Sequence, residues 1–400
     1  MSLKKVTLKN FRTCHDVELN DLGHLTVLMG RNGVGKTTIL QGIEWMARTA
    51  SSSNTVQTAP LPNELFSISR QNFFGQLVFS MNGISYRYTL ELLFFKNGTG
   101  LINSVMQTEL KEQLERQVDT EIWQQLLTRT GEMVFGANGD RLAEIGQTMP
   151  MLPALAAIMP SGETKEVILP VLAYLRGVKY YSLDEITAPS SYKFVLDSDY
   201  KKWIEQSVDS INPDSSVVMR LLHMYNDRRN DFDELKELLG IQGLGILSSI
   251  EITSGIMDYL TYYLVYFQPG NGWEGVRRLL SLPFEKLSAG TRRILRILVS
   301  FFYDRNSVFL FEQPEDAIHP GLLRKLIGLL RSYDDRGQLI MASHSSDLFD
   351  VLKPEEVRLV TMQGGETKVR GLTESELASA KRFINEEGSL SDYLDLLETD

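Results

Sequence analysis

Apolar and polar residues alternate over residues 6–12 and again over residues 17–19. Successive side chains of a strand point to opposite faces of a sheet, so these two stretches predict a β-hairpin. Residues 25–29 are almost wholly apolar, which is typical of a short buried strand, and residues 38–47 carry apolar residues at helical spacing. The chain therefore begins with a hairpin that leads into a strand, a glycine-rich turn and a helix.

An antiparallel β region is predicted after this helix. Residues 50–63 are rich in Ser, Thr, Asn and Pro and predict a loop, while Asn82-Gly83 and Asn97-Gly98 predict tight hairpin turns. Residues 109–127 predict a helix. The strands predicted in this region are residues 76–80, residues 86–92, a weaker strand near Ile102, and residues 132–135.

Residues 140–240 are predicted to be mainly helical. A loop is expected near residues 188–191, and Gly240 is expected to end a helix over residues 231–240. Residues 262–267 predict a strand whose aromatic side chains belong to the core rather than to a base-stacking surface. Apolar heptads are not sustained, so no long coiled coil is expected. The prolines expected to divide the helical stretch are Pro150, Pro153, Pro160 and Pro170.

Apolar elements return in the last third of the chain. Residues 294–303 predict an apolar helix, and residues 307–311 and 338–342 predict buried strands. Thr373 and Glu376 have the spacing of a capping box, which predicts the start of a helix near an acidic C-terminal end.

The composition is that of a globular protein of two or three domains, or of one large domain with an insertion. Of the 400 residues 43% are apolar and 23% are charged, and the net charge is −10. This charge argues against a surface that binds nucleic acid all over, although a local basic strip remains compatible with it. The single cysteine, Cys14, cannot form an internal disulfide, and no apolar run has the length of a membrane span or a signal peptide. A cytoplasmic protein without membrane contact is therefore expected.

The glycine-rich turn fits the phosphate-binding pattern G-x-x-x-x-G-K-[ST]. Between a strand and a helix, such a loop directs its backbone N–H groups and the helix N-terminus at one point, where an anion is stabilised. Lysine in this pattern reaches the phosphates and the Ser/Thr hydroxyl reaches Mg²⁺. The candidate nucleotide-binding residues are Gly30, Arg31, Asn32, Gly33, Val34, Gly35, Lys36, Thr37 and Thr38.

Three later motifs carry polar residues at the ends of predicted elements. Ser288, Ala289, Gly290 and Thr291 open the apolar helix, with Ser288 as a candidate cap and hydroxyl donor. The first buried strand ends in Glu312, Gln313 and Glu315, where carboxylate oxygens suit Mg²⁺ beside phosphates. The second buried strand ends at His344.

The order of these motifs resembles that of the ABC-type ATPases: Walker A, signature, Walker B and switch histidine. Within that class the chain is similar to the branch that contains RecF, SMC heads and OLD proteins, through residues 8–12, residues 30–33, Pro314-Glu315 and His319-Pro320. The resemblance implies an α/β fold, an ABC-ATPase head with a P-loop mixed sheet and an antiparallel β subdomain, plus a mainly helical insert. We accordingly expect an N-terminal lobe over residues 1–140, the insert over 141–260, and a C-terminal lobe with a short helical tail over 261–400.

The resemblance also implies roles for these residues. Lys36 and Arg12 would bind ATP, Thr37 and Glu312 would hold Mg²⁺, and His344 would sense the γ-phosphate. The signature residues 288–291 would act in trans, on ATP bound by the other chain of a head-to-tail homodimer or higher oligomer. The Q-loop glutamine remains open between two candidates, Gln71 and Gln76.

Gln313 departs from the family pattern, which has a catalytic glutamate at this position. An amide orients water but cannot take its proton, so we expect slow hydrolysis with Glu315 or His344 in partial compensation. In the alternative interpretation Gln313 is a tolerated variant and Glu315 does the work.

Two functions follow from the resemblance. The first is an ATPase that senses a trigger and controls a separate effector, such as a nuclease or toxin, in bacterial anti-phage defence; about 55 residues after His344 are too few for a nuclease domain of ordinary size. The alternative is a RecF-like DNA-binding ATPase of repair or recombination, and a transporter motor is disfavoured by the motif pattern. The arginines that could contact DNA are Arg277, Arg278, Arg292, Arg293 and Arg296.

Two polar stretches of the insert have a structural explanation beside a functional one. Asp197-Ser198-Asp199 is expected in a solvated loop rather than in a catalytic cluster. Lys201, Lys202 and Trp203 could form a contact patch, although a half-buried tryptophan on a helix explains them as well.

Overall fold

The computed structural model describes residues 1–53, 72–97, 105–183, 194–207, 217–270, 281–386 and 388–399. The chain forms two compact units. The first comprises Met1–Tyr180, Asn306–Glu312 and Gly337–Asp400, and the second comprises Tyr181–Arg305 and Gln313–Arg336. The boundaries expected near residues 140 and 260 lie inside these units, so the three-part division remains a proposal.

The first unit contains an antiparallel eight-stranded sheet in the order β2-β1-β4-β5-β6-β7-β8-β9. The predicted hairpin at the N-terminus is confirmed, and so is the turn between β4 and β5, where Asn82 and Gly83 have φ of 51° and 79°. The strands are β1 (Ser2–Phe11), β2 (Cys14–Leu19), β4 (Phe73–Met81), β5 (Ile84–Asn97), β6 (Val105–Gln117), β7 (Trp123–Thr130), β8 (Met133–Gly136) and β9 (Arg141–Glu144).

The helix predicted over residues 109–127 is wrong, because β6 and β7 occupy this stretch. Leu110, Glu112 and Leu114 are all buried, so the segment does alternate between buried and exposed positions as a strand does. A charged residue at a buried position concealed this alternation. Glu112 is tolerated there because it pairs with Arg129, and both side chains are completely buried.

This buried ion pair also joins the sheet to the turn that precedes the next helix. Glu112 accepts hydrogen bonds from the Tyr88 hydroxyl at 2.6 Å and from the backbone N–H of Met151 at 2.8 Å. Burial raises the pKa of Glu112, against the opposing effect of the Arg129 charge. Arg129 donates to the backbone carbonyl oxygens of Gly131, Gly146, Gln147 and Met149.

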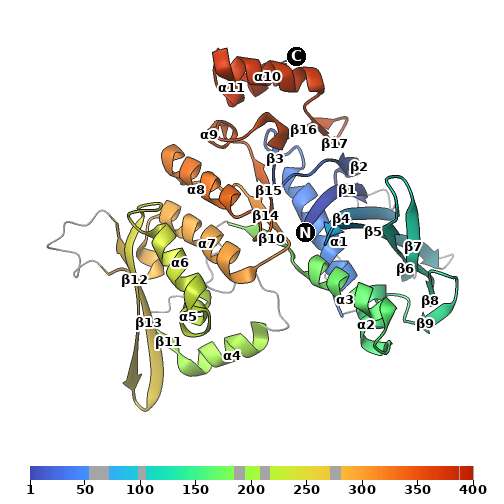
Figure 1. Cartoon of the computed structure of the whole chain (residues 1–400), viewed down its shortest axis with the longest axis horizontal. Helices are drawn as coiled ribbons and strands as arrows, with labels where there is room; N and C mark the ends of the chain where they lie inside the picture. The colour runs from blue at the N-terminus through green and yellow to red at the C-terminus, as the bar shows by residue number, and fades with distance from the viewer. Residues whose placement is uncertain are drawn as a thin grey trace. The chain divides into compact units, whose positions relative to one another are not determined.

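The second sheet of the first unit has the order β10-β14-β15-β3-β16-β17. Strands β14, β15, β3 and β16 are parallel, and β17 runs antiparallel to β16. In Figure 1, β3 from the blue N-terminal part lies among the orange strands β15 and β16. Three of these strands confirm predicted buried strands: β3 (Leu25–Met29), β14 (Val308–Glu312) and β15 (Gln338–Ser343). The other three were not predicted: β10 (Val178–Ser182), β16 (Val357–Gln363) and β17 (Glu366–Gly371).

Helix α1 is the predicted helix after the glycine-rich turn, and its buried face packs on the antiparallel sheet. The Trp45 ring lies edge-on to Phe73 with centroids 5.0 Å apart, and 5.8 Å from Phe11. The capping box of α10 is confirmed by the contacts of Thr373 and Glu376. Pro170 lies inside α3 and does not end it, contrary to the prediction. The helices of this unit are α1 (Lys36–Ser51), α2 (Met151–Ile158), α3 (Glu163–Arg176), α9 (Ser346–Phe349), α10 (Glu374–Glu386) and α11 (Leu390–Thr399).

The second unit combines helices with a three-stranded sheet in the order β11-β13-β12. The strand predicted over residues 262–267 is part of β13, and Phe267 is a core residue as expected. The helix that Gly240 ends is α6. The elements are β11 (Val195–Leu196), α4 (Asp197–Ser207), α5 (Val217–Asp227), α6 (Arg229–Leu239), β12 (Leu247–Met257), β13 (Leu260–Pro269), α7 (Ala289–Asp304) and α8 (Pro320–Ser332).

The polar residues of the insert belong to α4. Asp197 and Asp199 begin this helix rather than a loop, because carboxylates are stabilised at a helix N-terminus and Asp197 pairs with Lys201 at 2.7 Å. Trp203 is half-buried on the same helix, 6.0 Å from the Tyr303 ring, which favours the structural interpretation of this tryptophan.

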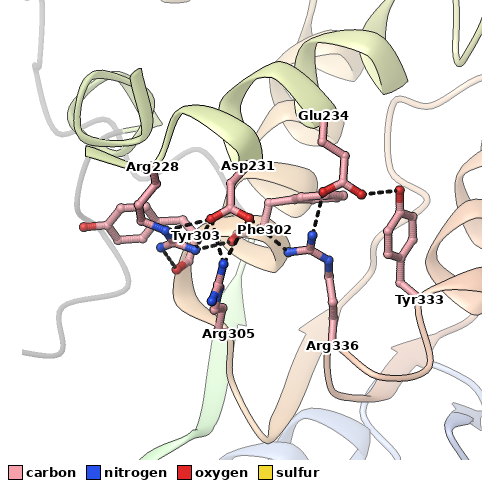
Figure 2. Close-up of polar contacts among 8 residues, drawn as sticks. All are labelled: Arg228, Asp231, Glu234, Phe302, Tyr303, Arg305, Tyr333 and Arg336. Atoms are coloured by element: carbon pink, nitrogen blue, oxygen red, sulfur yellow. Dashed lines mark hydrogen bonds and ion pairs between the residues drawn. The ribbon is translucent and has the colours of Figure 1, made fainter. Parts of the chain in front are cut away.

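A polar cluster in the second unit connects α6 to the C-terminal end of α7 (Figure 2). Arg228 donates to the carbonyl oxygens of Phe302 at 3.0 Å and Tyr303 at 2.6 Å. Arg228, Arg305 and Arg336 all approach the carboxylate of Asp231. Glu234 accepts from Arg336 and from the Tyr333 hydroxyl, at 2.7 and 2.8 Å. The insert helix is therefore fixed to the helix that the signature opens.

Several predictions lie outside the described residues. These are most of the loop over residues 50–63, Gly98 of the second hairpin turn, the strand near Ile102, the loop near residues 188–191, Gln71, Arg277 and Arg278. Among the helices that are described, none has both the length and the apolar character needed to cross a membrane.

Candidate functional site

The glycine-rich turn connects the buried end of β3 to the N-terminus of α1. Gly35 caps α1 in a left-handed conformation, with φ of 102°, and no side chain accepts a hydrogen bond at the cap. The first turn of α1 carries no acidic residue. The positive end of the helix is therefore directed at the loop, as anion binding requires.

Thr367 on β17 supports this loop from behind and had no signal in the sequence. Its hydroxyl oxygen lies 2.9 Å from the carbonyl oxygen of Val34 and 2.8 Å from the Thr13 hydroxyl. A Cβ atom on Gly35 would lie 2.1 Å from the same hydroxyl oxygen. The loop therefore needs glycine at this position both for its backbone conformation and for the close approach of β17.

Lys36 lies over the loop from the first turn of α1. Its ammonium group donates to the carbonyl oxygens of Gly30 and Arg31, at 2.7 and 2.8 Å. The side chain is buried, while Arg31, Asn32 and Gly33 at the tip of the loop are exposed. This arrangement places a cation beside the exposed backbone of the loop, where a phosphate chain would lie.

Parallel pairing brings the candidate residues of three strands to one edge of the sheet. In the ladders Met29 is aligned with Ser343, and Ala342 is aligned with Glu312. The glycine-rich turn, Glu312 and His344 therefore all stand at the carboxyl ends of neighbouring strands, where ligands bind in open α/β sheets. His344 is exposed at this edge.

The structure brings Thr37 and Glu312 into direct contact, although 275 positions separate them in the chain. The Thr37 hydroxyl donates a hydrogen bond to Oε1 of Glu312, and the Tyr180 hydroxyl of β10 donates to Oε2. Tyr180 carries no motif and was not predicted. A hydroxyl and a carboxylate together offer the oxygen ligands that Mg²⁺ prefers, since Mg²⁺ commonly takes only one or two carboxylates from protein. The donor set therefore fits the magnesium ion, and Thr37 and Glu312 would hold it.

Arg12 lies at the end of β1 and contacts α1 rather than the loop. Its guanidinium donates to the Gln41 side chain at 2.5 Å. Gln76, one of the two Q-loop candidates, lies in β4 and donates to the Thr89 hydroxyl at 3.1 Å. No contact of these residues with the glycine-rich loop is among those found in the described residues.

Gln313, Glu315 and the signature belong to the second unit. Gln313 has φ of 45°, a conformation that side-chain-bearing residues rarely adopt, and its carbonyl oxygen accepts a hydrogen bond from Arg293 of α7 at 2.6 Å. Glu315 is 7% exposed. His319, at the other end of this segment, caps α8 by accepting from the backbone N–H of Gly321 at 3.2 Å.

The signature residues surround the N-terminus of α7. Ser288 is the N-cap, and its hydroxyl accepts from the backbone N–H of Thr291 at 3.2 Å, as predicted. Ser288 and Ala289 are exposed. A Cβ atom on Gly290 would lie 2.3 Å from the carbonyl oxygen of Ala317, so glycine allows the segment after β14 to approach the signature closely.

The structure describes no group of three or more His, Cys, Asp or Glu side chains arranged to hold a metal ion.

The phosphate-binding loop lies at the carboxyl end of parallel strands, and a carboxylate from β14 contacts the threonine of this loop. This combination defines a P-loop ATPase. Two family models agree: "AAA ATPase domain" matches residues 1–125, and "AAA domain, putative AbiEii toxin, Type IV TA system" matches residues 173–350. The OLD nuclease of Thermus scotoductus is 24% identical over 371 residues, which are 90% of this chain and 62% of that protein. These matches fit an ABC-type ATPase of the branch that contains OLD and RecF proteins.

RecF proteins match a shorter stretch. The "DNA replication and repair protein RecF" of Lactococcus lactis subsp. cremoris is 43% identical over 51 residues, and that of Streptococcus gordonii is 45% identical over 51 residues. Each match covers 13% of this chain and 14% of the RecF protein. The matches thus cover less than two thirds of the length of the OLD nuclease and of the RecF proteins.

Among solved structures, the SMC head domain from Thermotoga maritima aligns with a TM-score of 0.44 and 11% identity, over 93% of this chain and all of that one. An SMC head bound to the C-terminal winged-helix domain of ScpA aligns with a TM-score of 0.46 and 13% identity, over 94% and 99% of the two chains. The α/β fold class and the antiparallel sheet are as expected, since the described residues form helices, a mixed sheet and an antiparallel eight-stranded sheet.

Proposed function

We propose that this chain binds ATP with Mg²⁺, hydrolyses it slowly and uses the bound nucleotide to hold two chains together. The observation that carries the proposal is the contact between Thr37 and Glu312, which joins the phosphate-binding loop to the acidic end of β14. Lys36 would bind the β- and γ-phosphates, and Thr37 with Glu312 would hold Mg²⁺, which supplies charge stabilisation to the transferring phosphoryl group. His344 would sense the γ-phosphate.

The signature is proposed to act on the ATP of a second chain. Ser288 and Ala289 are exposed at the N-terminus of α7, where a helix end and a hydroxyl are available to an anion. A γ-phosphate bound from both sides makes the stability of the dimer depend on the nucleotide state. This arrangement is a switch whose lifetime hydrolysis would set.

The proposed output is control of a separately encoded effector, such as a nuclease, in bacterial anti-phage defence. Support comes from the likeness to the OLD nuclease over 90% of this chain and from the AbiEii-type family model. The match covers 62% of the OLD nuclease.

The test is ATP-dependent dimerisation, measured by light scattering with ATP, ADP or no nucleotide. Ser288→Asp keeps a good N-cap residue but places a negative charge where the partner's triphosphate would lie, so ATP should still bind while the dimer is lost. Ser288→Asn is the matched neutral control and should dimerise. A wild-type chain whose mass is the same with and without ATP would refute the switch.

A RecF-like DNA-binding ATPase is the second candidate, favoured by the local RecF matches. The described arginines give it little support, because Arg292 donates to Leu287 O at 2.9 Å, Arg293 to Gln313 O, and Arg296 to Leu183 O at 3.3 Å. ATP-dependent binding to duplex DNA that weakens steeply with salt would favour this candidate over the first.

A further inference from the structure

The carboxylate of Glu312 has a different partner on each oxygen. The Thr37 hydroxyl donates to Oε1 from the phosphate-binding loop, and the Tyr180 hydroxyl donates to Oε2 from the neighbouring strand β10. Tyr180 thus binds the carboxylate oxygen that the proposed metal ligand Thr37 does not contact. No motif of the chain includes this tyrosine.

The position of Tyr180 is fixed by the sheet. Strand β10 lies next to β14 in the sheet order, and the backbone N–H of Val308 at the start of β14 donates to the carbonyl oxygen of Gly177 at 3.0 Å. Tyr180 follows Gly177 by three residues, and Glu312 ends β14. A phenol ring has few rotatable bonds, so a tyrosine on a paired strand presents its hydroxyl with little loss of side-chain entropy.

A glutamate that acts as a Mg²⁺ ligand, as proposed for Glu312, needs a second contact that fixes its side chain. Thr37 is held at the first turn of α1. The glutamate side chain has one more rotatable bond than an aspartate side chain. Binding the metal must restrict this additional rotation, which costs side-chain entropy. Mg²⁺ requires nearly ideal octahedral geometry, so a ligand that moves between rotamers binds it poorly. A hydrogen bond to Oε2 removes this freedom and leaves Oε1 directed at Thr37.

We propose that Tyr180 is a positioning residue for the magnesium site: its hydroxyl holds Oε2 of Glu312 so that Oε1 and the Thr37 hydroxyl are pre-arranged as a pair of Mg²⁺ ligands. The inference rests on the proposed function, because it takes the Thr37–Glu312 pair to be the metal site. It assigns to Tyr180 no contact with the nucleotide itself.

The experiment compares Tyr180→Phe with wild type by titrating MgCl₂ into the full chain with a fluorescent ATP analogue. The concentration of Mg²⁺ for half-maximal enhancement of nucleotide binding should rise about tenfold, the effect expected of one lost hydrogen bond to a charged group. Binding of the analogue in EDTA should not change. Tyr174→Phe is the matched control, because the Tyr174 hydroxyl is buried and has no hydrogen-bond partner among the described residues.

A second comparison separates positioning from a general structural effect. In a Glu312→Ala background, Tyr180→Phe should have no further effect on the Mg²⁺ titration, because the residue acts only through that carboxylate. An unchanged Mg²⁺ requirement in Tyr180→Phe, or an equal loss with and without Glu312, would overturn the role of Tyr180 while the ATPase assignment stands. Wild-type binding that ignores Mg²⁺ would instead refute the metal site and this role together.

Discussion

Arg293 donates a hydrogen bond of 2.6 Å from Nη1 to the backbone carbonyl oxygen of Gln313. Arg293 belongs to α7, the helix that the signature opens, and Gln313 follows the last residue of β14. Gly290 and Ala317 approach each other closely in the same unit. The signature and the segment after β14 therefore form one connected structure, in which Arg293 contacts the backbone of Gln313.

Replacing Gln313 by Glu should increase the rate of ATP hydrolysis. A carboxylate at this position can accept the proton of the attacking water, and general-base assistance is worth about 10²–10⁴-fold. Phosphoryl transfer depends mainly on positioning, so we expect at least a several-fold rise in kcat, measured as steady-state phosphate release. Glu315→Gln serves as the parallel variant. If it abolishes turnover while Gln313→Glu changes nothing, Glu315 is the working base and the slow-switch interpretation is wrong.

Removing the charge of Lys36 should weaken ATP binding without unfolding the chain. Lys36→Met keeps a buried apolar stem of similar length and loses the ammonium group, so the charge-assisted contact with phosphate is lost. Loss of such a bond should weaken binding about tenfold to a hundredfold. The check is a nucleotide titration beside a thermal unfolding curve. Wild-type affinity in a folded Lys36→Met variant would exclude the loop as the phosphate site.

Two glycines of the loop should differ in their tolerance of alanine. Gly33 and Gly35 both have positive φ, at 83° and 102°. A Cβ atom on Gly33 meets nothing within 4 Å, whereas one on Gly35 meets Thr367 at 2.1 Å and Thr13 at 3.1 Å. Gly33→Ala should cost only the backbone strain of about 1–2 kcal/mol, and Gly35→Ala should cost more because β17 must also move. Urea unfolding of both variants measures the difference, which should shrink in a Thr367→Ala background.

Asp231 should make the second unit acid-sensitive. Burial would raise its pKa, but the hydrogen bond from Arg228 and the charges of Arg228 and Arg305 outweigh burial and lower the pKa below its ordinary 3.8. The unfolded chain therefore binds the proton more tightly, so the stabilisation is complete above this ordinary value and is lost as the pH falls through the lower folded pKa.

Asp231→Asn should therefore destabilise the protein by about 3 kcal/mol at pH 7, the low end for a broken buried pair, since Arg305 is 63% exposed. This difference from wild type should shrink in unfolding experiments below pH 4. Asp233→Asn on the same helix is the control, because its pair with Arg229 is about half exposed on both sides and should contribute under about 1 kcal/mol. Equal losses for the two variants would contradict the role given to the arginine cluster.

Arg129→Met should destabilise the first unit strongly. The variant leaves the completely buried Glu112 without its cation and four backbone carbonyl oxygens without their donor. The expected loss is about 3–5 kcal/mol. Because burial already favours the neutral form of Glu112, the double variant Arg129→Met with Glu112→Gln should recover part of the loss. If the stability losses of the two single variants simply add in the double variant, measured by urea unfolding, Glu112 and Arg129 are not coupled.

The sequence by itself determined the features that depend on neighbouring residues. Strand β3, the glycine-rich turn and α1 could be predicted from one short stretch of chain. The cap at Ser288 and the helix end at Gly240 could each be predicted from the residues next to them. Periodicity and caps report interactions between residues a few positions apart, which is why they could be read directly.

Only the tertiary structure decided the contacts that close long loops of chain. The 109–127 prediction failed because a buried charge at Glu112 is stable only with Arg129 opposite it. Thr367 behind the loop and Tyr180 beside Glu312 are likewise brought in by strand pairing, with no local pattern to announce them. The sequence located the loop and the acidic strand end separately, but their meeting at Thr37 and Glu312 depends on the order of parallel strands, which residue patterns along a single chain do not encode.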